Sequence, residues 1–129
     1  RMALKHPRDL LNCRLVSLAH ERDITWEKWF DAAKVTEYQM SKHSTTVTSG
    51  DMALSAALSG HGVTLAAGAL FSPYIMTGQL IFPFKVQHPE TLHRYLAYDA
   101  QSPKIKRIQL FNAWLQSEIK MSDELLTQI

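Results

Sequence analysis

The 129-residue chain lacks most of the features that would indicate disulfide or membrane chemistry. Its one cysteine, Cys13, cannot form an internal disulfide, and a reducing compartment suits such a chain. The most apolar stretch, residues 62–76, is interrupted by Gly68, Ser72 and Pro73, so no apolar run reaches the ~18 residues of a membrane-spanning helix. No signal-peptide pattern opens the sequence. We therefore expect a cytoplasmic protein with no membrane partner.

An excess of charge of one sign is also lacking. The chain has 14 Lys and Arg residues against 12 Asp and Glu residues, which leaves a formal net charge of +2. This balance by itself indicates neither a nucleic-acid partner nor a membrane surface. The hydrophobic fraction of 46% and the charged fraction of 20% are typical of a soluble globular domain, and the length is enough to bury a sizeable core.

Motifs that carry catalysis, metal binding or cofactor binding are missing as well. The six histidines include no pair at helical i,i+3 or i,i+4 spacing, and there is no HExxH, CxxC or GxSxG motif. Residues 60–62, Gly-His-Gly, are too short for a dinucleotide-binding turn and follow a predicted helix instead of opening one. We therefore expect no metal, no cofactor and no enzymatic activity. The histidines are His6, His20, His43, His61, His88 and His93.

Short apolar runs alternate with helical patterns along the chain. This alternation predicts an α/β fold with a mostly parallel sheet flanked by helices in three layers. Strands are predicted at residues 15–18, 44–48, 63–66, 80–82 and 95–98. Helices are predicted at residues 7–11, after a cap at Asp23 or Thr25, from residue 50 to Gly60, around residues 70–75 up to Gly78, and from residue 102 onward, with a tail from Ser122 that frays.

One corner of this pattern indicates ligand binding. Thr48 and Ser49 place hydroxyls at the carboxyl end of a predicted strand, and the next helix begins at Gly50. In open parallel sheets ligands bind beyond the carboxyl ends of the strands, and a helix N-terminus offers free N–H groups with a partial positive charge. An effector with a carboxylate or an amide would suit this corner. Alternatively, Thr48 or Ser49 caps its own helix, as Ser and Thr commonly do.

Several segments together resemble a known family. They are similar, in order and spacing, to the C-terminal effector-binding domain of the LysR-type transcriptional regulators, and the likeness covers about residues 7 to 119. Trp26-x-x-Trp29-Phe30 resembles the branch that contains the glycine-cleavage activator and the β-lactamase regulators. The other segments are Pro7-Arg8-Asp9-Leu10, residues 55–63 (SAALSGHGV), Thr77-Gly78-Gln79-Leu80 with Pro83-Phe84, Arg94-Tyr95-Leu96, and Phe111-Asn112-Ala113-Trp114-Leu115.

The resemblance implies a fold like that of the type 2 periplasmic binding proteins, with an effector in a cleft between two subdomains. By position, residues 1–88 would form the second subdomain, residues 89–121 the returning strand and closing helix of an incomplete first subdomain, and residues 122–129 a tail. Thr48, Ser49 and Gly50 would line the cleft, and Tyr95 would face it. Gly50 departs from the family pattern, which tends to place a hydroxyl residue there, so the same ligand is in doubt.

The resemblance also implies partners. We expect a small-molecule effector, such as an amino acid or another carboxylate, and contact with promoter DNA only through an N-terminal helix-turn-helix that this sequence does not contain. We also expect a homo-oligomer, because an apolar stripe on the last helix would otherwise face water. The stripe consists of Ile105, Ile108, Phe111, Leu115 and Ile119.

Two functions from other classes stay open. A solute-binding protein of a transporter shares the fold, and a small α/β enzyme would share the layered architecture. The coding sequence upstream separates them from a regulator, because a winged helix-turn-helix favours the regulator and a signal peptide favours the transporter.

Overall fold

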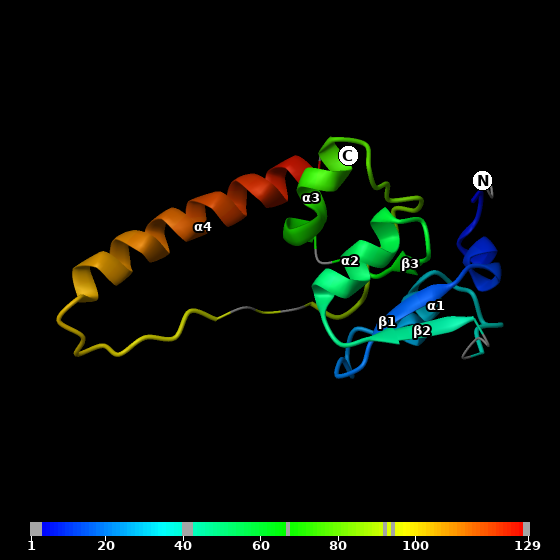
Figure 1. Ribbon diagram of the computed structural model, residues 1–129, viewed down its shortest axis with the longest axis horizontal. Helices are drawn as coiled ribbons and strands as arrows, with labels where there is room; N and C mark the ends of the chain where they lie inside the picture. The colour runs from blue at the N-terminus through cyan, green and yellow to red at the C-terminus, as the bar shows by residue number, and fades with distance from the viewer. Residues whose placement is uncertain (1–3, 40–42, 67, 92, 94, 128–129) are drawn as a thin grey trace.

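A parallel sheet of three strands lies at the centre of the α/β unit (Figure 1). The computed structural model describes residues 4–39, 43–66, 68–91, 93 and 95–127. The strand order is β2-β1-β3, and Leu15 of the middle strand pairs with Ser44 on one side and Val63 on the other. The strands are β1 (Leu15–Leu18), β2 (Ser44–Val47) and β3 (Val63–Thr64).

Helices cover both faces of this sheet. Neighbouring residues of β1 point to opposite faces, so each face has apolar side chains that a helix can bury. Leu15 is fully buried in a cluster on the face covered by α1 (Trp26–Ala32), whereas Val16 belongs to a cluster on the face covered by α2 (Gly50–Leu58). The first cluster contains Leu10, Leu15, Trp26, Trp29, Phe30 and Val35, and the second contains Val16, Val47 and Ala53. The predicted three-layer arrangement is confirmed for this part of the chain.

Local signals explain where the first long helix begins and ends. The Thr25 hydroxyl accepts a hydrogen bond from the Lys28 amide at 3.4 Å, so Thr25, and not Asp23, is the N-cap of α1. The Trp26 indole N–H donates to the Val16 carbonyl at 3.0 Å, which ties the helix to the central strand. The helix ends where Lys34 adopts a φ of 59°, a left-handed conformation that does not continue an α-helix.

Glycine serves two different purposes between α2 and the last strand. Gly60 has a φ of 72°, as predicted for the residue after a helix end. Gly62 has no side chain because the chain passes close to β1: a Cβ on Gly62 would lie 2.6 Å from the Val16 Cγ2 atom and 3.0 Å from the Arg14 carbonyl oxygen. The close approach lets the Val63 amide donate to the Arg14 carbonyl at 2.9 Å, which starts the pairing of β3 with β1.

Two predicted strands do not form in the described part of the chain. Residues 77–80 form a turn and a bend after α3 (Gly68–Met76), in which the Leu80 amide donates back to the Tyr74 carbonyl at 3.0 Å. Residues 81–82 have no regular structure, and Ile81 is 70% exposed. Residues 95–98 are extended and exposed and lie outside the sheet. An apolar run becomes a strand when a ladder partner lies beside it, and neither run has one here. β3 is also shorter than predicted.

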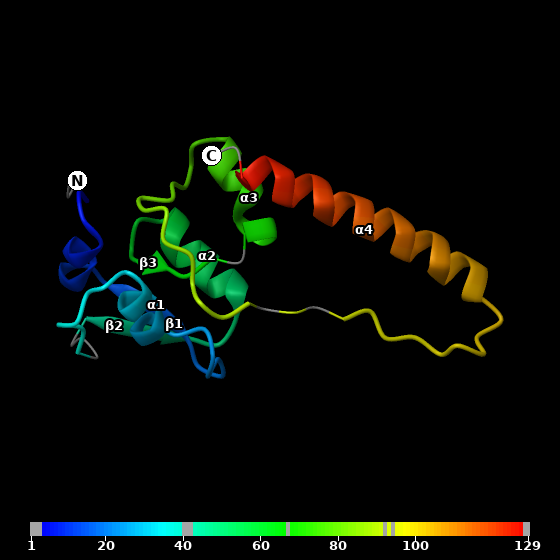
Figure 2. The same ribbon diagram turned by 180° about the vertical axis from the view of Figure 1, so that it is seen from behind.

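The C-terminal part departs from the α/β unit. Thr91, His93 and residues 95–104 belong to a largely exposed arm, hereafter the arm, and α4 (Ile105–Thr127) then runs back until its end packs on α3 (Figures 1 and 2). The fraying predicted from Ser122 is wrong, because the helix continues to Thr127. Within the described ranges, no helix combines the length and the apolar character needed to cross a bilayer.

Candidate functional site

The corner between β2 and α2 brings three of the four predicted site residues together. Ser49 is the N-cap of α2: its hydroxyl accepts a hydrogen bond from the Met52 amide at 3.3 Å, and its carbonyl accepts one from the Ala53 amide at 3.2 Å. Capping is therefore the observed role of Ser49. The exposed Thr48 hydroxyl donates to the Met52 sulfur at 3.4 Å, a weak acceptor that a ligand oxygen could replace.

Gly50 occupies the first position of α2 without a backbone reason for being glycine. Its conformation is helical, and a Cβ there would meet the Leu70 Cδ2 atom at 3.7 Å, which is an ordinary van der Waals distance. An alanine would therefore fit. The missing side chain leaves room beside the first amides of the helix.

Tyr95 lies away from this corner. It belongs to the arm, its side chain is 87% exposed, and its ring lies 6.5 Å from the ring of His93, centroid to centroid. Arg94, which belongs to the same family-like segment, lies outside the described residues. The structure thus assembles Thr48, Ser49 and Gly50 and does not bring Tyr95 to them.

Charge at the corner comes from two sources. The first amides of α2 carry the partial positive charge of a helix N-terminus, which attracts anions. The exposed carboxylate of Asp51 lies in the same first turn. A purely anionic ligand would meet both an attractive helix end and a repulsive carboxylate, whereas a zwitterionic ligand could satisfy each with a different group.

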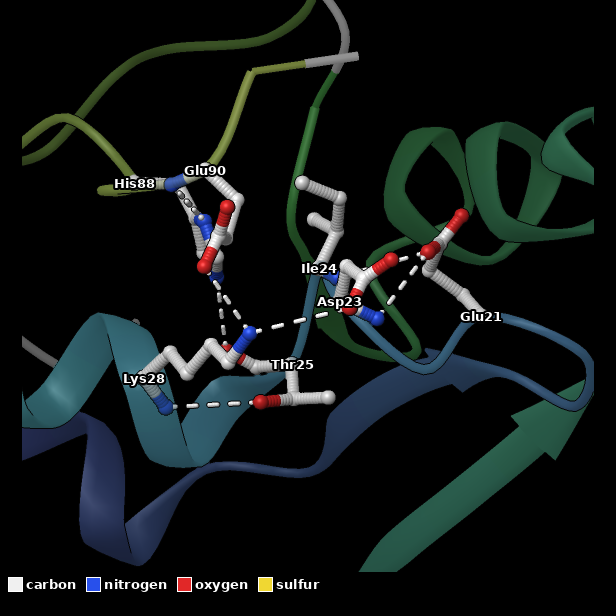
Figure 3. A network of polar contacts seen from close by, with 7 residues as sticks. All are labelled: Glu21, Asp23, Ile24, Thr25, Lys28, His88 and Glu90. Carbon is white, nitrogen blue, oxygen red and sulfur yellow. Dashed lines mark hydrogen bonds and ion pairs between the residues drawn. The ribbon is translucent and has the colours of Figure 1, made fainter.

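Sequence reasoning missed a polar network between the start of α1 and residues 88–90 (Figure 3). Lys28 Nζ lies 3.0 Å from Glu90 Oε1 and 3.8 Å from Asp23 Oδ1, and the hydrogen bond to Glu90 raises the pKa of Lys28. His88 Nε2 lies 3.0 Å from the Thr25 carbonyl oxygen. Because Glu90 is 62 residues from Lys28 and His88 is 63 residues from Thr25, no local sequence pattern predicts these two contacts.

Cys13 behaves as a structural residue. The half-buried Cys13 thiol lies 3.8 Å from the Asp9 carbonyl oxygen, packs against the first core cluster, and has its pKa raised by burial. A raised pKa lowers the fraction of reactive thiolate. Among the residues with described positions, no group of three His, Cys, Asp or Glu side chains could hold a metal ion.

Two hollows in the described surface lie on or next to α4 and not at the corner. One is lined by residues of a single stretch of this helix from Gln116 to Glu124, and the other by residues 103–107. Each hollow is lined by one short stretch of chain, whereas pockets for small molecules usually draw on several elements. We therefore base the site on the β2–α2 corner.

Comparison with known proteins identifies the family of the chain. A family described as the LysR substrate binding domain matches residues 1–120. The chain is 30% identical over 115 residues to the HTH-type transcriptional regulator BlaA of Proteus vulgaris, and 27% identical over 121 residues to the HTH-type transcriptional regulator PerR of Escherichia coli K12. These alignments take in 89% and 92% of the chain but 38% and 39% of the two regulators, so the chain spans about two-fifths of their length.

A solved structure shares the fold. The effector domain of the transcriptional regulator AmpR of Pseudomonas aeruginosa superimposes with a TM-score of 0.67 at 21% identity, covering 95% of this chain and 59% of that domain. The likeness confirms the predicted α/β fold of the periplasmic-binding-protein type. The chain belongs to the LysR substrate-binding domain family.

Proposed function

We propose that the chain senses a small-molecule effector on behalf of a LysR-type transcription regulator and carries out no catalysis. The observation that carries the proposal is the corner at the carboxyl end of β2. There Thr48 presents an exposed hydroxyl, and Gly50 leaves room beside the first turn of α2. Membership of the substrate-binding family supports a ligand at such a corner.

The charges at the corner favour an amino acid over a simple carboxylate. A carboxylate suits the free amides at the start of α2. An ammonium group on the same ligand would suit the exposed Asp51 carboxylate, which a simple carboxylate would meet as a repulsive charge. For Tyr95 to contribute a hydroxyl, the arm has to fold against the corner in the effector-bound protein.

The rest of the proposal concerns the full-length regulator. We propose that it contacts promoter DNA through a helix-turn-helix segment outside this sequence, acts in the cytoplasm and forms a homo-oligomer. The names of the two related regulators support the first point. The exposed apolar side chains of α4 support the last, because Leu110 is 74% and Trp114 56% exposed, and such surfaces commonly mark interfaces.

The test combines a ligand screen with substitutions in the full-length regulator. A thermal-shift screen of amino acids and other carboxylates identifies the effector, since binding to the folded state raises the melting temperature. Thr48→Val and Ser49→Ala should then raise the effector concentration for half-maximal promoter response by about tenfold, the effect of losing ~1.4 kcal/mol. Tyr95→Phe tests whether the phenol hydroxyl takes part.

Ser49→Ala also removes a helix cap, so its melting temperature is measured alongside the promoter response. Ser117→Ala, on the exposed face of α4, is the matched control and should leave the response unchanged. An unaltered response in both Thr48→Val and Ser49→Ala would remove the corner from the site.

A further inference from the structure

The segment between the α/β unit and the arm lies along α1 with every second residue turned toward the helix. Phe84 and Val86 pack against the first core cluster, and His88 and Glu90 make polar contacts with the start of α1, whereas Lys85, Gln87 and Pro89 are exposed. Alternation of this kind is typical of an extended chain with one face covered. The Trp29 indole N–H donates to the Val86 carbonyl at 3.1 Å and pins the middle of the segment.

The two ring nitrogens of His88 have opposite roles in this contact (Figure 3). Nε2 faces the Thr25 carbonyl oxygen at 3.0 Å, so it has to carry the hydrogen, because a carbonyl only accepts. Nδ1 receives the Glu90 amide at 3.0 Å, so it has to present a lone pair. Only the neutral Nε2–H tautomer makes both bonds. In a protonated ring both nitrogens are donors, and Nδ1–H would oppose the Glu90 N–H.

Several charged groups lie on the elements next to His88 (Figure 3). The start of α1 supplies Lys28, the loop before it supplies Glu21 and Asp23, and the segment itself supplies Glu90. Glu27, also on α1, interacts electrostatically with Tyr38. A protonated ring would be repelled by the Lys28 ammonium group or would draw the Glu90 carboxylate away from it. Either movement dismantles the contacts that join Lys28, His88 and Glu90.

We propose that residues 84–90 are a latch on α1 that closes only while His88 is neutral and that holds the base of the arm. The exposed arm begins directly after Glu90, so the latch sets the direction in which the arm leaves the α/β unit. The functional effect of the latch rests on the proposed function. The arm carries Tyr95, and opening the latch changes the position of Tyr95 relative to the Thr48–Gly50 corner.

The latch itself is tested by hydrogen exchange of the 129-residue chain, followed by NMR at pH 7.5 and pH 5.0. The reporters are the Glu90 amide and the Trp29 indole N–H. After correction for the intrinsic pH dependence of exchange, the Glu90 amide should lose about tenfold of its protection at the lower pH. His88→Gln, whose amide can donate to Thr25 and accept from Glu90 without titrating in this range, should stay protected at both pH values.

Two further variants complete the set. His88→Phe removes both ring contacts and should expose the Glu90 amide at either pH. His61→Gln is the matched control, because exposed His61 contacts Ser59 and lies outside the latch. In this variant the protection of the Glu90 amide should change with pH as it does in the unsubstituted chain. A Glu90 amide that is unprotected at pH 7.5, or a His88→Gln chain that loses protection on acidification, would overturn the latch.

The movement of the arm has its own readout. Spin labels at positions 31 and 101, both exposed, are placed in a chain carrying Cys13→Ser. The distance distribution between them should be narrow at pH 7.5 and broad at pH 5.0, and broad at both values with His88→Phe. A distribution that is unchanged while the Glu90 amide responds would overturn the link between latch and arm. Neither readout uses an effector, so failure of the Thr48 and Ser49 test would count against the proposed function and leave the latch standing.

Discussion

The α/β unit and α4 have similar patterns of apolar residues, but these residues are buried in the unit and many of them are exposed on α4. In the unit, Phe30 and Leu15 are fully buried between α1 and the sheet. On α4, Leu110 is 74% exposed and Trp114 56% exposed, although the helix is the longest in the described chain. Periodicity therefore predicts that a helix has an apolar face, but it does not predict what covers that face.

Two aromatic pairs make the contrast concrete. Trp26 and Trp29 on α1 have ring centroids 5.7 Å apart and are both buried, and Phe111 and Trp114 on α4 are also 5.7 Å apart and are both exposed. The spacing along the helix brings the rings together in each case. The different environments follow from tertiary packing, because Leu10, Phe30 and the sheet close over the first pair.

The sharpest test of this contrast removes one phenylalanine from each region. Phe30→Ala should lower the free energy of unfolding by about 3–5 kcal/mol, because it empties a fully buried site. Phe111→Ala should lower it by less than ~1 kcal/mol, because Phe111 is 49% exposed and its removal takes away little buried apolar surface. Urea denaturation of the two variants measures both values, and equal losses would break the comparison.

Glycine substitutions test the close packing of the unit against an open position. Gly62→Ala should lower the free energy of unfolding by ~1–3 kcal/mol, because its Cβ would lie 2.6 Å from the Val16 Cγ2 atom. Gly50→Ala should cost nothing, since its Cβ would meet Leu70 at 3.7 Å. Thermal melts of both variants check this, and a stable Gly62→Ala chain would mean that β3 does not approach β1 so closely.

Alanine enlargement compares the two helix faces in the same way. Ala56 on α2 packs against the cluster of Val16, Val47 and Ala53, so Ala56→Leu should lower the melting temperature at a cost of up to ~3 kcal/mol. Ala113 is exposed on α4, and Ala113→Leu should have little effect. Tolerance of Ala56→Leu would place α2 farther from the sheet than the structure does.

The smallest expected effect depends on pH. The Asp9 carboxylate accepts hydrogen bonds from the His6 amide at 2.9 Å and the Lys5 amide at 2.8 Å, and these bonds, chiefly the one from His6, lower the pKa of Asp9 below its usual 3.8. A lowered folded-state pKa stabilises the fold above pH 3.8, and this contribution disappears as the pH falls through the lowered value.

Asp9→Asn should therefore melt slightly below the unsubstituted chain at neutral pH, and the gap should close in acid. The effect is small because the group is exposed. Asp123→Asn on α4 makes the same change in net charge and serves as the control. A gap that widens on acidification would contradict the sign of the Asp9 shift.

The sequence predicted the elements of the α/β unit well because their signals are local. Thr25 and Ser49 cap the helices that follow them, and the period of Trp26, Trp29 and Phe30 belongs to one helix. The strands predicted at residues 80–82 and 95–98 failed because a strand needs a ladder partner, and composition does not supply one. At the site, the corner was predictable from adjacent residues.

Contacts between distant residues were out of reach of such reasoning. The latch joins Thr25 and Lys28 to His88 and Glu90, more than sixty residues along the chain. The position of Tyr95 depends on the course of the arm, which no periodicity encodes. In both cases the prediction lacked the relative positions of segments that are far apart in the sequence.

Hydrogen exchange of the full-length regulator, with and without the effector found in the thermal-shift screen, tests the central claim most directly. We expect the effector to slow exchange of the amides in residues 48–53, where the first turn of α2 would bind its carboxylate, and to leave the exposed face of α4 around Ala113 unchanged. Protection confined to other elements, with no change at residues 48–53, would contradict the assignment of this corner as the effector site.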